Sequence, residues 1–412
     1  MTIGEERTPG KQRVGRRNLL LGSAAAGVGI VAGVGLDRAA SGLTSPPPAA
    51  APQTTTGQDR VPFHGRHQAG VETPPPAHTT FVALDLRPES DSSAIERMLR
   101  VLSADAESLS HGEAALADTE QELAAEPSRL TVTFGFGPEL VSRAGATVPT
   151  WLRPLPAFGI DRLEDAWSHG DLLLQIGSDD PLTLAHTQRM LLKDSRSFAA
   201  VRWIQSGFRR ARGTEKSGTT MRNLFGQVDG TANPVPGSDD FDQLIWRRGE
   251  NPAWLEGGTG FVLRRIQMDL DKWDRLDRSG RETAVGRTLA NGAPLTGSEE
   301  HDEPDLGAMD KLGLPVIPAF AHIRRARTMD MSQRIYRRGY NYDEPPGADS
   351  VSRSGLLFAS YQADVDAQFV PLQRQLDELD LLNEWTTPIG SAVFALPPGC
   401  RVGGFVGETL FG

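Results

Sequence analysis

Two stretches of the chain repeat one pattern, and this repeat constrains the fold more than any other sequence feature. Residues 171–179 form an apolar run that ends in a polar turn, and an amphipathic segment containing Gln188-Arg-Met-Leu191 follows. Residues 355–364 form a similar run, and Gln373-Arg-Gln-Leu376 follows at nearly the same interval. Each stretch predicts a buried strand, a turn and a helix. We therefore predict a duplicated α+β domain.

The elements around the first stretch complete a recognisable order. Period-two alternation with β-branched and aromatic residues indicates four strands, and apolar residues at helical spacing indicate two helices. The strands are predicted at 79–86, 130–136, 172–176 and 200–208, and the helices at 92–109 and 182–193. The resulting order, β-α-β-β-α-β, is that of a ferredoxin-like domain.

The second stretch lies in a similar series of elements. Strands are predicted at 261–270, 334–342, 356–361 and 392–396, and helices at 272–289 and 367–379. A long insertion, residues 290–332, separates the first of these helices from the second strand, and insertions of this length are usually functional. We predict an α+β fold of two ferredoxin-like domains with antiparallel sheets, at 78–222 and 223–412.

The N-terminus indicates export. Lys11, Arg13 and the adjacent Arg16 and Arg17 precede an uncharged run, residues 19–36, that is marginal for a membrane span and typical of a signal segment. The arginine pair resembles a twin-arginine signal, which implies export of the folded protein by the twin-arginine machinery to the cell envelope or the exterior. Residues 1–50 would hold this signal and the start of a linker, and residues 51–77 would form a Pro-rich linker. An uncleaved membrane anchor is the alternative.

Charge and cysteine content exclude several classes of function. The formal net charge of −10 disfavours binding to phosphate backbones, so we expect no nucleic-acid partner. Cys400 is the only cysteine, which excludes an intrachain disulfide, a Cys-x-x-Cys zinc site and covalent attachment of a c-type haem. No feature of the sequence specifies an oligomeric state.

One of the eight histidines stands out by its neighbours. His322 follows the apolar segment 317–321 and precedes Arg324, Arg325 and Arg327. A packed or surface histidine is the simpler interpretation. An apolar surface, an imidazole and nearby guanidinium groups are also what a haem requires, for its face, its iron and its propionates. Cys400 is an alternative ligand, although its Pro-Pro-Gly-Cys-Arg context lacks the Phe-x-x-Gly lead-in of a cytochrome P450 cysteine.

Four motifs resemble those of one family when they are taken in order. Gly226-Gln-Val-Asp-Gly230, with Thr231 and Asn233, resembles the Gly-x-x-Asp-Gly signature of the dye-decolourising peroxidases. Ala321-His-Ile-Arg324 resembles their proximal haem segment, Tyr336-Arg-Arg-Gly-Tyr340 their distal arginine strand, and residues 355–362 the strand after it. The resemblance covers roughly residues 79–412. It implies two ferredoxin-like domains with haem b bound non-covalently in the C-terminal one, in a bacterial branch that includes deferrochelatases.

The resemblance also implies roles for individual residues. His322 would be the axial iron ligand, with Asp364 as the acceptor for its other ring nitrogen and Asp366 as the rival acceptor. Asp229 would transfer the peroxide proton, although an Asp-Gly pair is also ordinary turn chemistry. Arg337, or alternatively Arg338, would stabilise the charge that develops as the O–O bond breaks.

Three further residues complete the expected site. Asn233 would order the loop that carries the aspartate, and Gly230 would let the backbone approach the porphyrin closely. Arg324 would pair with a propionate or lie at the surface. The expected activity is that of a secreted peroxidase, which reduces hydrogen peroxide through a ferryl intermediate and oxidises an organic or protein donor, such as dyes and phenols. A deferrochelatase-like enzyme and a haem carrier or sensor are the alternatives.

Overall fold

A computed structural model of the chain describes residues 55–412, apart from 250–251 and 349. The predicted signal at 1–50 and the first residues of the predicted linker lie outside the described residues. Residues 55–412 form one compact unit. Within this described part, none of the helices has the length and apolar character that a membrane crossing requires.

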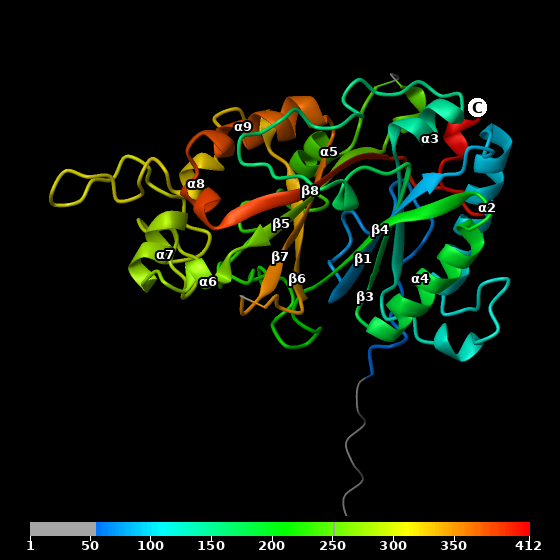
Figure 1. Ribbon diagram of the computed structural model, residues 1–412, viewed down its shortest axis with the longest axis horizontal. Coiled ribbons are helices and arrows are strands. Elements are labelled where there is room, and N and C mark those ends of the chain that lie inside the picture. The colour runs from blue at the N-terminus through cyan, green and yellow to red at the C-terminus, as the bar shows by residue number, and fades with distance from the viewer. Residues whose placement is uncertain (1–54, 250–251, 349) are drawn as a thin grey trace, which may run out of the picture. The chain divides into compact units, whose positions relative to one another are not determined.

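The first half of the body is a ferredoxin-like unit. Its elements are β1 (His78–Leu86), α2 (Ser92–Ser110), β2 (Thr131–Phe136), β3 (Leu172–Ser178), α4 (Pro181–Ser195) and β4 (Ala199–Phe208). The strands are antiparallel and ordered β4-β1-β3-β2. Asp91 and Asp180 begin the two long helices, because each carboxylate accepts a hydrogen bond from a free backbone N–H of the first turn. The two helices lie side by side over this half of the sheet (Figure 1).

The second half repeats the arrangement. Its strands are β5 (Thr259–Met268), β6 (Tyr336–Glu344), β7 (Arg353–Gln362) and β8 (Thr386–Leu396), with α9 (Val370–Leu379) between the last two. Their order, β6-β7-β5-β8, matches that of the first half. The predicted helix at 272–289 is two short helices, α6 (Leu270–Trp273) and α7 (Arg278–Val285). Asp277 caps the start of α7, and Gly286 ends it in the left-handed region, with a φ of 85°.

The two sheets join into one closed barrel, which the sequence did not indicate. β2 pairs with β8 through Phe136 and Ala395, and β4 pairs with β6 through Phe208 and Asn341. Closure covers the edge strands of both halves. The prediction of an α+β fold with two ferredoxin-like units and antiparallel strands is confirmed, and the join between the two sheets is an addition to it.

The predicted Pro-rich linker is wrong over its second part. Residues 63–77 are packed against the barrel, and the side chains of Phe63 and Val71 are buried. The amide of Gln68 donates to the carbonyls of Phe134 and Pro397, one from each half, and accepts from the backbone N–H of Phe134. The proline content predicted an extended backbone. The carbonyls of such a backbone are free to accept hydrogen bonds from buried donors, so the segment can pack against the barrel.

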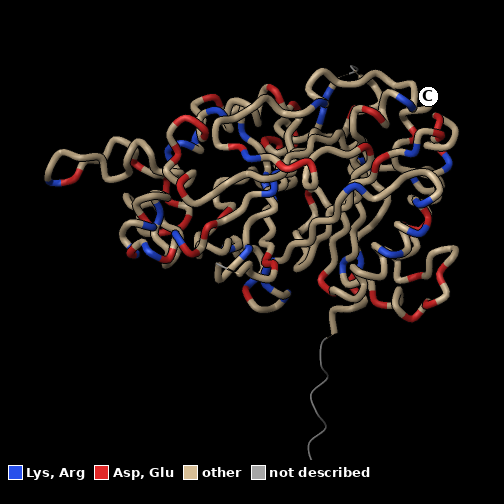
Figure 2. The backbone as a smooth tube through the Cα atoms, viewed as in Figure 1, with Lys and Arg blue, Asp and Glu red and all other residues tan. Residues whose placement is uncertain are grey.

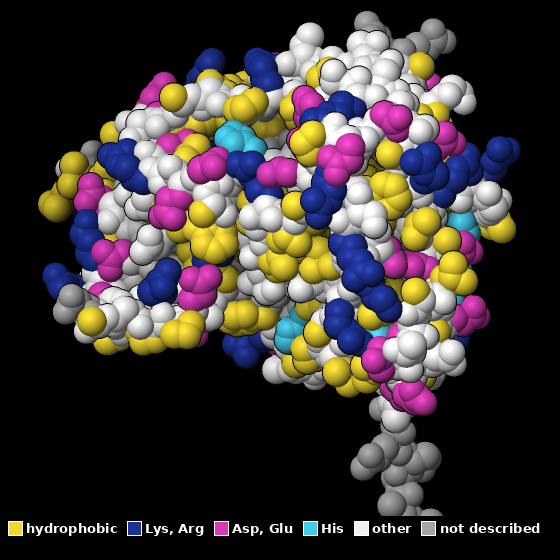
Figure 3. Space-filling model, turned by 45° about the vertical axis from the view of Figure 1, so that its right-hand side comes forward, with side chains coloured by type: hydrophobic (Ala, Val, Ile, Leu, Met, Phe, Trp, Pro, Cys, Tyr) yellow, Lys and Arg dark blue, Asp and Glu magenta, His cyan; other side chains and the backbone are white. Residues whose placement is uncertain are grey.

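Charged side chains of both signs alternate over the body. Figure 2 shows Lys and Arg interspersed with Asp and Glu along most loops and helices. On the face that Figure 3 displays, hydrophobic side chains form groups that charged side chains border. The acidic balance of the chain is therefore spread over the surface.

Candidate active site

The segment that positions the site is the predicted insertion between α7 and β6. Within it, His322–Arg325 forms the short helix α8, which lies against α9. A cavity of about 380 Å³ lies between this segment, β6, β7 and α9. Its apolar wall consists of Ile323, Ile335, Phe358, Phe369, Leu372 and Leu376. The insertion thus forms one side of the cavity and the second half of the barrel forms the other.

His322 is held at one side of the cavity by a carboxylate. Its Nδ1 donates to Asp380 Oδ2 at 2.6 Å, which leaves the Nε2 side of the ring available. The Asp380 side chain is 4% exposed, whereas 34% of the His322 side chain remains exposed. Burial lowers the pKa of His322, but the charge of Asp380 and its hydrogen bond outweigh that effect, so the pKa is raised. A carboxylate on one ring nitrogen is the usual support of a metal-binding imidazole.

The predicted acceptors for His322 are wrong. Asp364 instead accepts from the backbone N–H of Ala367 at 3.0 Å and begins the π-helical turn that leads into α9. Asp366 pairs with Arg153 at 2.8 Å. One signal for Asp380 was present: the helix dipole disfavours a carboxylate directly after Leu379, at the C-terminal end of a helix, unless another group stabilises it.

An arginine on another wall is paired with an aspartate. Arg337 lines the cavity, and its Nε lies 3.4 Å from Asp229 Oδ1. Both side chains are about three-quarters buried, at 26% and 22% exposed. Asp229 Oδ2 also lies 3.4 Å from the amide of Asn223. The predicted pair of an acid-base group and a charge-stabilising group is thus brought together, from a loop and a strand far apart in the sequence.

Asn233 fixes the position of the aspartate loop. Its amide donates to the carbonyl of Arg337 at 2.7 Å and accepts from the backbone N–H of Arg337 at 3.1 Å. The loop is therefore tied to β6 at the residue that faces the cavity. Gly230 has a φ of 129°, a conformation that other residues rarely adopt.

Arg338 does not face the cavity. Its side chain is 1% exposed and donates to the carbonyls of Gly70, Val71 and Thr73. Successive side chains of a strand point to opposite faces, so β6 directs Arg337 to the cavity and Arg338 to the packed N-terminal segment. Of the two arginines that the sequence left open, Arg337 is the one in the site.

Arg324 is also directed elsewhere, which corrects its predicted role. Its guanidinium donates to the carbonyls of Ile317 and Leu306, so it joins separate parts of the insertion to one another. The cations that do line the cavity are Arg287, Arg327, Arg334 and Arg337. Sequence reasoning missed Arg287 and Arg334, because neither lies in a motif with the other site residues.

Cys400 is not placed to bind a metal. It is buried away from His322 among the core residues of the first half, with its Sγ 3.5 Å from His64 Nδ1. Burial raises the pKa of its thiol to about 11, which disfavours the thiolate that a metal would need.

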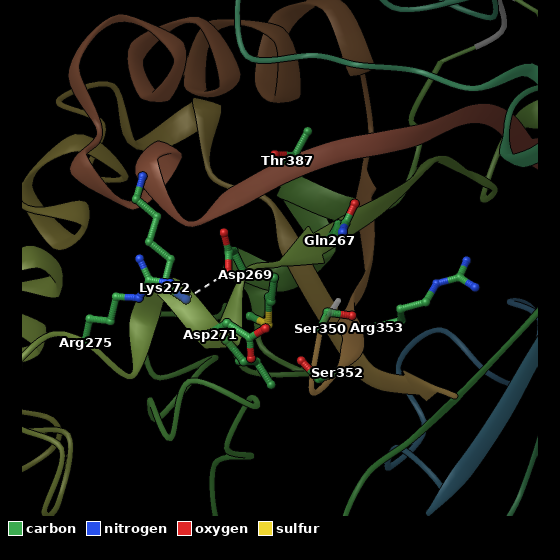
Figure 4. A pocket seen from close by; sticks show the side chains of 11 residues that line it. Gln267, Asp269, Asp271, Lys272, Arg275, Ser350, Ser352, Arg353 and Thr387 are labelled. Atoms are coloured by element: carbon green, nitrogen blue, oxygen red, sulfur yellow. Dashed lines mark hydrogen bonds between the residues drawn. The ribbon is translucent and has the colours of Figure 1, made fainter. Parts of the chain in front are cut away.

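A second, larger cavity of about 510 Å³ lies at the end of β5 (Figure 4). Charged and polar side chains surround it, including Asp269, Asp271, Lys272, Arg275 and Arg353. Among the described residues that line it there is no histidine. The apolar cavity beside His322 is therefore the better site for a flat apolar ligand.

The structure is a barrel of two ferredoxin-like units, and its second half carries an apolar cavity lined by a histidine and several arginines. These features are typical of a haem-dependent oxidoreductase. Residues 68–209 match the N-terminal domain of Dyp-type peroxidases, and residues 220–401 match the C-terminal domain. The chain belongs to the Dyp-type peroxidase family. The predicted family and the predicted class of enzyme, a peroxidase, are confirmed.

Two kinds of relative, dye-decolorizing peroxidases and deferrochelatases, are similar to this chain over most of its length. The dye-decolorizing peroxidase of Thermobifida fusca is 37% identical over 98% of this chain and 99% of its own length. The deferrochelatase of Escherichia coli is 35% identical over 83% of this chain and 85% of its own length. The crystal structure of a DyP-type peroxidase from Cellulomonas bogoriensis is 55% identical, with a TM-score of 0.85, and covers 87% of this chain and 99% of that one.

The different directions of the two arginines on β6 predict different effects of removing them. Arg338→Met should lower the free energy of unfolding by about 3 kcal/mol, because three buried carbonyls lose their donor. Arg337→Met, on the same strand, should lower it by less than about 1 kcal/mol, since its side chain faces a cavity. Denaturant unfolding of both variants measures the difference. Equal losses of stability would contradict the assigned directions.

Proposed function

We propose that this chain is an exported haem b peroxidase that reduces hydrogen peroxide with electrons from organic donors such as dyes and phenols. The proposal rests on the arrangement of side chains on two walls of one cavity. A histidine oriented by Asp380 lies on one wall, and Arg337, which is paired with Asp229, lies on another. The leader of the sequence, with its two adjacent arginines, supports export to the cell envelope or the exterior.

The residues around the cavity fit a haem in three respects. The Nε2 side of His322 is available for iron, since Nδ1 is bonded to Asp380. The apolar wall suits the porphyrin faces, and Phe358 and Phe369 are part of it. The arginines of the lining supply charge for the propionates. The cofactor is held without covalent bonds to the chain.

Bound haem would supply the iron at which the peroxide O–O bond breaks. Asp229 takes the proton from the oxygen of peroxide that binds and returns it to the oxygen that departs, so that water leaves. The Arg337 guanidinium stabilises the negative charge on the departing oxygen. Asn233 keeps the two groups in register, because it binds the backbone of Arg337 from the loop that carries Asp229.

A second candidate is release of iron from haem, as in a deferrochelatase. The 35% identity to the Escherichia coli protein of that name favours it. Both functions begin with haem in the same cavity. They differ in what leaves it: oxidised donor in one case, and iron with free porphyrin in the other.

Mixing the haem-loaded protein with hydrogen peroxide and an organic donor tests the proposal. A peroxidase consumes peroxide in proportion to donor oxidised, and its haem absorbance returns after each addition. Fluorescence of iron-free porphyrin would instead identify the iron-releasing enzyme. Haem that bleaches slowly, without donor oxidation, would identify a carrier or sensor and overturn the proposal.

Haem retention should depend on His322 and Asp380 in a graded way. His322→Ala removes the ligand and should abolish stable binding. Asp380→Asn leaves the ligand but weakens its support, and should lower haem affinity by about 10- to 100-fold. Asp366→Asn, which alters only the pair with Arg153, is the control and should bind as the parent does. Transfer of haem to a competing apoprotein measures the affinity of each variant. If Asp380→Asn bound haem as tightly as the parent, Asp380 would not be the residue that supports His322.

Asp229 and Arg337 should act on one transition state. Asp229→Asn should slow peroxide cleavage by about 10²- to 10⁴-fold and Arg337→Leu by about 10²- to 10³-fold. The double variant should lose less than the product of the single losses. The losses should be measured from about pH 4 to 7, a range that spans the ordinary ionisation of carboxylates and histidines. Stopped-flow absorbance across that range is the measurement, and a double variant as fast as the parent would eliminate the mechanism.

A further inference from the structure

Three methionine side chains are exposed in the described part of the chain. Met329 is 95% exposed, Met309 60% and Met331 58%, whereas Met98, Met190, Met221 and Met268 are buried. Of the three exposed residues, Met331 alone lines the cavity beside His322. Met309 lies in the insertion and forms a β-bridge with Pro315. This part of the insertion extends from the body (Figure 1).

Hydrogen bonds fix the backbone of Met331 beside the cavity. Met331–Gln333 forms a 3-10 turn that Asp330 begins by accepting from the backbone N–H of Ser332 at 3.0 Å. Nε of Arg334 donates to the carbonyl of Met331 at 3.1 Å. The turn packs against the π-helical turn Val365–Phe369, and Phe369 lines the same cavity. Met331 is therefore a residue of the cavity lining whose backbone position is fixed.

A thioether is a good acceptor for the oxygen of a peroxide. In the balanced reaction, one oxygen of hydrogen peroxide forms a bond to sulfur, the O–O bond breaks, and the other oxygen leaves as water with both protons. Sulfur is oxidised by two electrons and peroxide is reduced by two, so the step needs no further reductant. The product, methionine sulfoxide, is polar, and sulfoxide reductases convert it back to methionine.

We propose that Met331 is a turnover-dependent modification site, which accepts an oxygen atom from peroxide in the cavity when organic donor is scarce. The inference rests on the proposed function, because it requires haem-dependent peroxide chemistry in this cavity. The chain then carries its own acceptor for oxidising equivalents that find no donor. Other apolar lining residues, such as Phe369 and Leu372, have no sulfur lone pair to offer.

The exposure of the three methionines separates this chemistry from ordinary oxidation in solution. Peroxide from bulk water should oxidise Met329 fastest and should oxidise Met309 and Met331 at similar rates, since these two are 60% and 58% exposed. A ligand in the cavity can only lower the exposure of Met331. Faster oxidation of Met331 than of Met309 would therefore originate in the cavity.

Oxidation would also change the cavity itself. The sulfoxide oxygen accepts hydrogen bonds, and the guanidinium groups of Arg327 and Arg334 line the same cavity. A polar group on an otherwise apolar wall lowers the affinity for apolar ligands. The modified protein should therefore bind apolar aromatic donors more weakly, and reduction of the sulfoxide should restore binding.

The experiment compares sulfoxide formation at single methionines by peptide mass spectrometry. The haem-loaded protein receives hydrogen peroxide in small additions without donor, and the haem-free protein is treated in parallel. In the haem-loaded sample Met331 should be oxidised roughly fivefold or more faster than Met309, and the two rates should be within about twofold of each other without haem. An organic donor should lower the excess at Met331 by competition.

Two variants serve as matched controls. Met309→Leu should leave the oxidation of Met331 unchanged. In Met331→Leu, donor affinity should no longer fall after peroxide treatment. A haem-loaded protein that consumes peroxide but oxidises Met331 and Met309 equally would overturn the inference and leave the proposed function intact. A protein that binds no haem, or consumes no peroxide with haem bound, would overturn both.

Discussion

The alternation of side chains along β6 is the constraint on which the site depends. Arg337 points to the cavity because Arg338, its neighbour, points the other way and is held by three backbone carbonyls of residues 70–73. The buried guanidinium also donates to the hydroxyl of Tyr340, and these hydrogen bonds hold the strand that carries it in place. The N-terminal segment, which contributes no side chain to the cavity lining, thereby fixes the direction of a residue that does.

A second long-range contact fixes the other wall. His322 belongs to the insertion and Asp380 follows α9, so their hydrogen bond joins two segments that share no strand pairing. Leu381 N–H donates to the carbonyl of Phe320 beside it, which holds the insertion in the same place through the backbone. The imidazole is thus oriented by the second ferredoxin-like unit and positioned by the loop inserted in it.

The parts that the sequence predicted are those with a local signal. The repeated order of strands and helices follows from apolar periodicity, and it located β1, β3 and α4 to within two or three residues. Asp229, His322 and Arg337 lie in motifs of adjacent residues, so they could be named. Barrel closure could not be predicted, because only one residue pair joins the sheets at each seam, as with Phe136 and Ala395. Asp380 was missed and Arg338 could not be distinguished from Arg337, because hydrogen bonds between distant segments decide their roles.

Proton supply separates the two functions that one such cavity could perform. Cleavage of peroxide moves one proton from one oxygen to the other, so a single carboxylate that takes and returns it, the role that we propose for Asp229, is sufficient. Removal of iron from haem leaves two protons on the porphyrin nitrogens, and these must come from solvent. Asp302 and Glu303 line the cavity from the insertion, and Glu303 is paired with Arg327. The backbone N–H groups of Glu299 and Ser298 donate to Asp302 and lower its pKa, which disfavours Asp302 as a proton donor. The role that we propose for Asp229 therefore suits peroxide reduction better than the release of iron, for which Asp302 is a poor source of protons.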